Sequence, residues 1–228
     1  MPEIPDLEVI KDFLNERIAG REVVRATAPK AWIVRSLAAE HFEQDVVGRR
    51  FGTIRRIGKD LLFPLDPDRL LVANLMLTGR FQYTEPSARV SKQTFFTLGT
   101  ADADLRYLDG RSMGRIHYVR PDQLDTIARL QDQGPDALDG GVSYEEFKER
   151  LRPYTGEIKG VLARGKFLAG IGNAYVDEIL WEARVSPFRK GGGPCPRCGT
   201  TISEITPNQR ITSWCRTCQP GQGTALHP

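Results

Sequence analysis

The hydrophobic positions near the start of the chain recur every three to four residues. This spacing predicts an amphipathic helix over residues 6–18, preceded by a short tail, with charged side chains opposite the apolar stripe. The stripe consists of Leu7, Ile10, Phe13, Leu14 and Ile18.

From about residue 22 to residue 119 the pattern changes to short or alternating apolar runs, interrupted by Gly, Pro and Asp. Such runs are typical of strands in an antiparallel β-sandwich or barrel. The expected strands are Val23–Ala26, Thr53–Ile57, Leu61–Leu65, Leu70–Met76, Thr94–Leu98, Leu105–Leu108 and Ile116–Val119.

Helical spacing returns after residue 120. Ser143 and Glu146 have the spacing of a capping box. The predicted fold is therefore α+β and multidomain: a β-sandwich with an N-terminal helix over 1–120, a helical domain over 121–190, and a cysteine-containing tail over 191–228 after a flexible Gly191–Pro194 joint. The expected helical segments are Pro121–Gln133, Ser143–Arg152, Glu157–Arg164 and Ala174–Arg184.

The charge balance permits a nucleic-acid partner without requiring one. The 228 residues have a formal net charge of +3, and the pI near 8.7 lies below the value of about 9 that marks a strongly basic nucleic-acid-binding domain. Because charged residues are frequent among the first thirty, we predict no signal peptide, transmembrane helix or membrane partner. We expect a cytoplasmic monomer, associated with the nucleoid if the source is prokaryotic.

All four cysteines lie in the C-terminal tail, as two Cys-x-x-Cys pairs. Two such pairs can supply four thiolates to one tetrahedral Zn²⁺, as in a zinc ribbon. A closed four-sulfur shell leaves no position for a reacting water, so the predicted zinc is structural. The predicted ligands are Cys195, Cys198, Cys215 and Cys218.

Three further short segments suggest chemistry, although each has an ordinary alternative. Arg210, between the cysteine pairs, could contact a phosphate from the tip of a hairpin or be a solvated surface charge. The glycines of residues 170–173 could leave N–H groups free for a phosphate, with Asn173 capping the next helix, or could form a plain interhelical turn. Lys59 lies in a probable turn between strands, where a solvated lysine is the default.

The N-terminus offers a nucleophile. Removal of Met1 would leave the secondary amine of Pro2, whose reference pKa of about 8 is well below the value of about 10.4 for lysine. Such an amine can attack a sugar carbon and form an iminium. Glu3 is close enough in sequence to act as its general acid and base. The alternative is an ordinary exposed N-terminus.

Together these features resemble the formamidopyrimidine-DNA glycosylase and endonuclease VIII family. The resemblance is carried by Met1–Pro5, Gly58-Lys59, Gly170–Asn173 with Tyr175, and the zinc finger with Gln209–Thr212. It implies a bifunctional DNA glycosylase and AP lyase of base excision repair, in which residues 121–190 form a helix–two-turn–helix DNA-binding domain. Damaged or abasic double-stranded DNA would lie in a cleft between this domain and the β-sandwich.

The resemblance also implies residue roles. Pro2 would form the iminium and Glu3 would move protons, so that an oxidised base is removed and the strand is cut by β,δ-elimination. Lys59 and Arg210 would hold phosphates around the lesion, while Gly172 and Asn173 would contact the DNA backbone. The positions aligned with the side chains that fill the vacated base stack are Leu77, Arg111 and Met113. Core packing of Leu77 and Met113 and a plain surface charge at Arg111 are equal alternatives.

Several positions depart from the family pattern. Asp6, Asn74 and Arg164-Gly165 replace the usual Glu, His and Asp-Gln, and Arg189 is followed almost directly by Cys195, where family members place further helices and a base-capping loop. The preferred lesion therefore stays open. A catalytically silent protein that binds damaged DNA is the main alternative, and a zinc-ribbon protein that binds RNA or another protein comes last.

Overall fold

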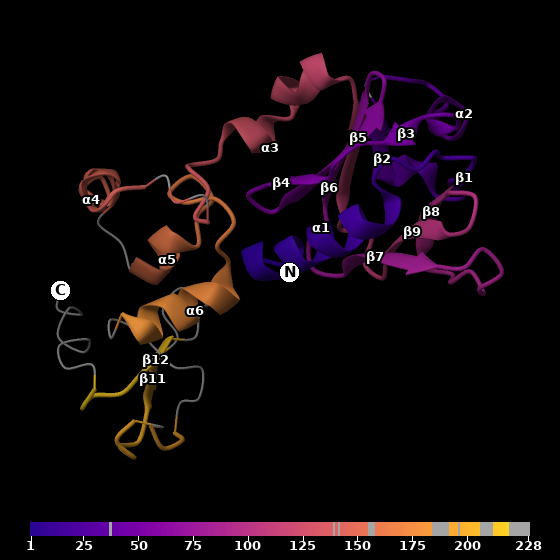
Figure 1. Cartoon of the computed structure of the whole chain (residues 1–228). Helices are drawn as coiled ribbons and strands as arrows, with labels where there is room; N and C mark the ends of the chain where they lie inside the picture. Colours follow the sequence, from indigo (N-terminus) through magenta and orange to yellow (C-terminus); the bar gives the residue numbers. More distant parts are fainter. Residues whose placement is uncertain are drawn as a thin grey trace.

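The computed structural model describes residues 1–36, 38–138, 140, 142–154, 158–183, 192–195, 197–205 and 212–218. A sheet-rich half is followed by a helical half, from which a small hairpin extends (Figure 1). The N-terminus lies where the two halves meet, beside α6 (Asn173–Glu182). This placement brings the first residues of the chain to the boundary between the halves.

The elements follow the expected order. The other helices are α1 (Ile4–Ile18), α2 (Phe42–Val46), α3 (Ala128–Gln131), α4 (Tyr144–Leu151) and α5 (Ile158–Leu162), with 3₁₀ helices η1 (Ala31–Ile33) and η2 (Pro121–Thr126). The strands are β1 (Arg25–Thr27), β2 (Val34–Ser36), β3 (Arg50–Phe51), β4 (Arg55–Ile57), β5 (Asp60–Asp66), β6 (Arg69–Asn74), β7 (Gly79–Thr84), β8 (Thr94–Gly99), β9 (Asp104–Asp109), β10 (Arg115–Val119), β11 (Ser203–Ile205) and β12 (Thr212–Trp214).

Two sheets form the N-terminal half. One has the strand order β1-β8-β9-β7, and the other has the order β2-β10-β6-β5-β3, with β4 paired to β5. The prediction of a sandwich is confirmed. It is wrong in one detail, because β2 pairs in parallel with β10, whereas every other described pairing between named strands is antiparallel.

The larger sheet is buried on both faces. On β5, Leu61, Phe63 and Leu65 face the main core between the sheets, while Leu62 joins a second apolar cluster with Ile127. Alternate side chains of a strand point to opposite faces, so the second cluster lies on the outer face. The chain after β10, including η2 and α3, covers this face. The near-continuous apolar run of β5 follows from this double burial.

Some sequence expectations need correction. The helix expected over Pro121–Gln133 is two short pieces, η2 and α3, and the short strands β2 and β3 and the longer strand β7 were not predicted. The Gly191–Pro194 segment was expected to be a flexible joint, but its described residues are paired: Gly192 N–H donates to Ile202 O at 2.8 Å and Ile202 N–H donates to Gly193 O at 2.9 Å. These bonds pair the Gly192-Gly193 backbone with Ile202 at the start of the C-terminal ribbon.

The helical half has its own core beneath α4, α5 and α6. Ser143 caps α4, accepting the Glu146 N–H at 3.1 Å, as the capping-box spacing predicts for this bond. Phe167 and Val176 are fully buried in this core. Among the described helices, none is long and apolar enough to cross a membrane.

His117 on β10 gives the fold a pH dependence. It is half-buried near Arg129, Arg35 and Arg115, and burial together with these charges lowers the pKa of His117 from 6.5 to about 4. As pH falls, His117 is therefore protonated in the unfolded chain before it is protonated in the folded chain. The free energy of unfolding decreases between pH 6.5 and about pH 4. We expect His117→Gln to reduce this decrease by about 1–2 kcal/mol, measured as the difference in the free energy of unfolding in urea between pH 7 and pH 4. An equal difference for the parent and the variant would contradict the prediction.

Candidate functional site

Glu3 lies buried at the boundary between the two halves. Its carboxylate accepts backbone N–H groups from Gly172 at 2.8 Å, Ala174 at 3.0 Å and Tyr175 at 3.1 Å, and the residue is only 4% exposed. These are the N–H groups that the start of α6 leaves without intrahelical partners. The negative charge also lies at the positive end of the helix dipole. Glu3 is thereby fixed in one position.

This arrangement corrects the expectation for residues 170–173. Asn173 does not cap α6: the N-cap residue is Gly172, with no side-chain cap bond, and Asn173 is the first helical residue, with an exposed side chain. The N–H groups of Gly172, Ala174 and Tyr175 bind the carboxylate of Glu3, so in this structure these three are not free for a phosphate. The side chain of Asn173 stays available to a ligand at the surface.

The two glycines of the turn are needed for close approach. Gly170 has a φ of +93°, and a Cβ there would lie 2.3 Å from the side chain of Ile4. A Cβ on Gly172 would lie 2.4 Å from Oε1 of Glu3 and 2.8 Å from Nζ of Lys59. Larger residues would therefore push the N-terminal segment away from α6. The glycine pattern serves contact within the protein.

Lys59 joins the same group of side chains. Because its Nζ and Oε1 of Glu3 both approach Gly172, the ammonium lies beside the carboxylate. Burial lowers the pKa of Lys59, and the negative charge of Glu3 partly opposes that shift. The default expectation of a fully solvated surface lysine is thus wrong.

A buried arginine holds the turn that carries Lys59. Arg56 has a side chain that is 3% exposed, and it donates to Glu8 of α1 at 2.5 Å and to Asp136 of the helical half at 2.5 and 2.9 Å. Asp136 also accepts the Gly58 N–H at 3.0 Å. Burial raises the pKa of Asp136, but Arg56 and the N–H groups of Leu138 and Gly58 together outweigh it, so the net shift is downward. The charged network joins α1, the Lys59 turn and the helical half.

A second ion pair crosses the boundary directly after the turn. Asp60 is 1% exposed, pairs with Arg129 of α3 and accepts a bond from Gln133 at 3.4 Å. Burial raises the pKa of Asp60, with Arg129 acting in the opposite direction.

A pocket of about 390 Å³ opens between the halves at this place. Lys59 lines it, and so does Met1. Because the carbonyl of Met1 is bonded to the nitrogen of Pro2, loss of Met1 would leave the Pro2 amine where the chain enters the pocket. The remaining lining residues are Asp60, Asn74, Met76, Arg115, Arg129, Asp132, Gln133, Gly165, Lys166, Ala169 and Gly170.

Two positions that depart from the family pattern have defined contacts. Asp6 accepts the Glu3 N–H at 2.9 Å, so its shorter side chain still reaches the backbone of the glutamate. Asn74 is 5% exposed; it donates to the carbonyl of Lys59 at 3.1 Å and accepts the Met76 N–H at 3.2 Å. Both residues support the backbone of the pocket.

The three side chains expected to enter the DNA stack are all exposed. Leu77 is 51% and Met113 38% exposed, and Arg111 is also exposed. Core packing, the alternative for Leu77 and Met113, is therefore ruled out. They come from two loops, one between β6 and β7 and the other between β9 and β10, on the sheet-rich half.

Asp109 fastens these two loops together. Its carboxylate accepts a bond from Thr78 of the first loop and N–H groups from Arg111 at 3.0 Å and Gly114 at 2.7 Å in the second. Burial raises the pKa of Asp109, but these donors outweigh it and lower the pKa overall. The sequence did not single out this residue, because an aspartate at a strand end has no distinctive spacing.

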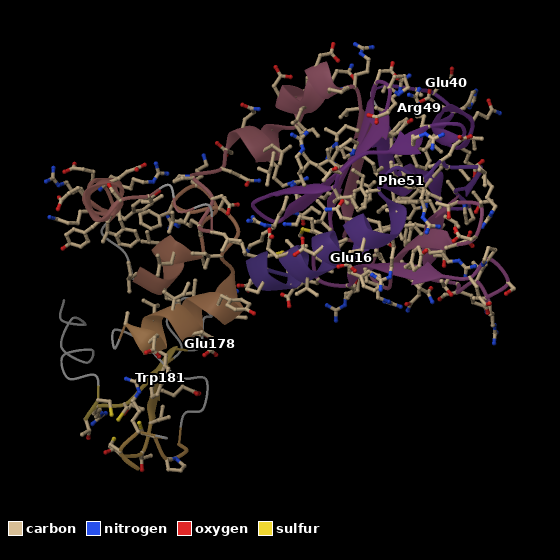
Figure 2. All side chains as sticks on the ribbon, viewed as in Figure 1. Glu16, Glu40, Arg49, Phe51, Glu178 and Trp181 are labelled. Carbon is tan, nitrogen blue, oxygen red and sulfur yellow. The ribbon has the colours of Figure 1, made fainter. Side chains whose placement is uncertain are left out.

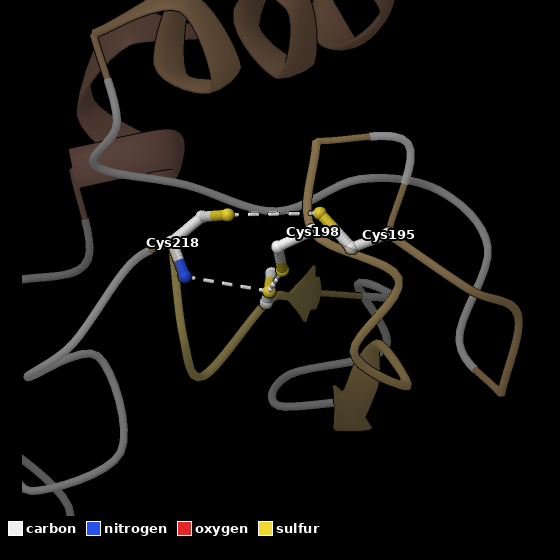
Figure 3. Close-up of side chains that lie close together, drawn as sticks. Cys195, Cys198 and Cys218 are labelled. Carbon is white, nitrogen blue, oxygen red and sulfur yellow. Dashed lines mark hydrogen bonds between the residues drawn. The ribbon is translucent and has the colours of Figure 1, made fainter.

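The four cysteines converge at the far end of the molecule (Figure 3). Their sulfur atoms all lie within 4.8 Å of one another, with Cys195 and Cys218 3.8 Å apart and Cys198 and Cys215 3.4 Å apart. Four sulfurs around zinc at about 2.3 Å would be about 3.8 Å apart. The donor set and spacing thus fit one structural zinc ion. Gln209 and Arg210, expected between the pairs, lie outside the described residues.

The zinc finger packs on the end of α6. Trp181 lies between that helix and the β11–β12 hairpin (Figure 2) and contacts the apolar cluster of Cys195, Ile202 and Cys215. Arg197 adds a cation–π contact, 4.8 Å from the centre of the Trp181 ring. The finger is therefore coupled to the helix whose first turn binds Glu3.

Zinc removal should release this finger. Zinc-finger peptides gain on the order of 10 kcal/mol from their metal, so we expect a chelator to unfold the hairpin and expose Trp181. Because β12 also contains Trp214, the measurement is tryptophan fluorescence of a protein with Trp32→Phe and Trp214→Phe, in which the emission of Trp181 should shift to longer wavelength. Unchanged emission after confirmed metal loss would contradict the coupling.

Family models match nearly the whole length of the chain. Residues 1–116 match the formamidopyrimidine-DNA glycosylase N-terminal domain, residues 133–197 the formamidopyrimidine-DNA glycosylase H2TH domain, and residues 192–221 a zinc finger found in FPG and IleRS. The first match alone spans more than half of the 228 residues.

Individual proteins of this family are also similar to the chain over most of its length. The formamidopyrimidine-DNA glycosylase of Desulfitobacterium hafniense (strain DSM 10664 / DCB-2) is 28% identical over 275 aligned positions, which cover 96% of this chain and all of that protein. The one from Lactococcus lactis subsp. cremoris is 31% identical over 83% of this chain and 70% of its own. A crystal structure of Lactococcus lactis Fpg with DNA containing an abasic site has a TM-score of 0.85 at 26% identity, covering 95% and 99% of the two chains.

The alignment with the Desulfitobacterium protein is longer than this chain of 228 residues. That relative therefore carries segments that this chain lacks. Residues 184–191 lie outside the described part of the chain.

Proposed function

The chain belongs to the formamidopyrimidine-DNA glycosylase family, and from this membership and the pocket geometry we propose that it is a bifunctional DNA glycosylase and AP lyase of base excision repair. Its substrate is double-stranded DNA with an oxidised base or an abasic site. The observation that carries the proposal is the position of Glu3, buried at the domain boundary with Lys59 beside it and Pro2 adjacent in the chain.

The reaction begins with attack by Pro2. Its free amine bonds to C1′ of the damaged nucleotide, the bond from C1′ to the base breaks, and the base leaves with a proton. The sugar ring opens to give an iminium between Pro2 and C1′. The base must first leave the stack, because C1′ is shielded inside a duplex.

Strand cutting follows from the same covalent intermediate. Loss of a proton from C2′ expels the 3′ phosphate, and a second elimination expels the 5′ phosphate; hydrolysis of the iminium then frees Pro2. The carboxylate of Glu3 accepts and returns protons in these steps. Its bonds to the start of α6 keep it from rotating away between steps.

The other candidate residues bind the DNA. Lys59 places a positive charge in the pocket, where it can hold a phosphate next to the reacting sugar. Leu77, Arg111 and Met113 occupy the space left by the displaced base. Asn173 and Arg210 contact the backbone, and one Zn²⁺ held by the four cysteines keeps the finger folded.

The products test this function. We expect the purified chain to cut a duplex at a single abasic site and to leave phosphates at both ends of the gap. A duplex with one oxidised base should release the free base as well. Tight binding of the abasic duplex without any cutting would instead support a silent damage-binding protein.

A further inference from the structure

The loop that carries Leu77 also contains an unusual backbone conformation. Among the described residues, two that are not glycine have a positive φ: Met76 at 52° and Ser112 at 55°. A side chain in this left-handed region crowds its own backbone, so glycine is favoured there. The two residues lie in the two loops that Asp109 fastens together.

The two residues differ in what their side chains contact. Ser112 is exposed and does not line the pocket. Met76 is partly buried, and its side chain is part of the pocket wall, together with Lys59 and Met1. Of these two residues, Met76 is therefore the one that places an apolar side chain where the reacting nucleotide would enter.

The backbone of Met76 is held in place by the group that supports Lys59. Asn74 accepts the Met76 N–H at 3.2 Å and donates to the carbonyl of Lys59 at 3.1 Å. Since Asn74 is 5% exposed, the link is shielded from water. The position of Met76 is therefore fixed relative to Lys59, although its flexible side chain can adapt to a neighbouring ring.

We propose that Met76 is a specificity-determining residue, whose side chain narrows the pocket and disfavours two-ring bases relative to single-ring bases. The inference rests on the proposed function, because it takes the pocket as the place where the displaced base binds. Of the two residues with positive φ, Met76 is the one that lines the pocket, and residues in unfavourable backbone conformations cluster at ligand sites.

The test compares excision of 8-oxoguanine with excision of an oxidised pyrimidine, in otherwise identical duplexes under single-turnover conditions. Met76→Gly removes a side chain from the pocket wall and relieves the cost of the positive φ, whereas Ser112→Gly relieves the same cost and removes a side chain that does not line the pocket. Met76→Leu keeps an apolar side chain of similar volume. Each protein is also assayed on a preformed abasic site, and its melting temperature is measured.

We expect Met76→Gly to raise the ratio of purine to pyrimidine excision by about ten-fold or more, as for other changes of pocket size. Ser112→Gly and Met76→Leu should keep the ratio within about two-fold of the parent. An unchanged or lowered ratio for Met76→Gly, in a protein that still cuts abasic DNA, would overturn the proposal for Met76 alone. A parent chain that cuts no abasic DNA would overturn the proposed function instead.

Discussion

A chain that keeps even one residue in front of Pro2 should lose strand cutting at abasic sites by roughly a thousand-fold or more. An amide nitrogen has no free electron pair for attack on C1′, so the iminium cannot form. The matched comparison is the chain that starts at Pro2 against the same chain with an added N-terminal glycine. Both are assayed on one abasic duplex under single-turnover conditions.

Binding separates this effect from misfolding. Because the contacts of Glu3 with α6 do not use the Pro2 nitrogen, the extended chain should bind the abasic duplex within about ten-fold of the parent affinity. A tag at the C-terminus serves as a control for added mass. Equal cutting by the extended and parent chains would rule out Pro2 as the nucleophile.

Glu3→Gln should lower base excision by about 10²- to 10⁴-fold. The amide keeps the shape of the side chain but carries no charge and cannot accept the protons that the reaction releases. It also turns one acceptor into a donor that faces the N–H groups of Gly172, Ala174 and Tyr175. We therefore expect a loss of stability of about 1–3 kcal/mol as well, measured by urea unfolding.

Glu178→Gln is the control for charge. Glu178 is an exposed residue of the same helix (Figure 2), so its replacement removes one negative charge from α6 without changing the contacts of Glu3. It should leave excision and stability close to those of the parent. If Glu3→Gln behaved like Glu178→Gln, the catalytic role of Glu3 would have to be abandoned.

The fold was largely predictable, because the spacing of hydrophobic residues predicts helices and strands, and the turn residues between them predict where these elements end. The helix expected over residues 6–18 is α1, and each strand expected between residues 22 and 119 has a counterpart. Two of the missed strands, β2 and β3, are too short for alternation, and the apolar run after residue 121 follows the outer face of a sheet and not one helix. β7 was overlooked although Phe81 and Tyr83 alternate with polar residues in it.

The site was predictable only where its chemistry lies in short motifs. The zinc ligands follow from their spacing, and they converge as expected. The supporting contacts do not have such a pattern: Arg56 and Asp136 are 80 positions apart in sequence, and Glu3 and Gly172 are 169 apart. The turn at residues 170–173 looked like a phosphate site because its actual partner lies at the other end of the chain.

Borohydride trapping tests the central claim most directly. The purified chain with a free N-terminus is mixed with duplexes that contain an abasic site, 8-oxoguanine or an oxidised pyrimidine, and the covalent products are mapped by mass spectrometry. We predict a reduced adduct on Pro2 with the abasic duplex and with at least one of the damaged bases. No adduct on any substrate, despite tight binding to the abasic duplex, would contradict the iminium mechanism.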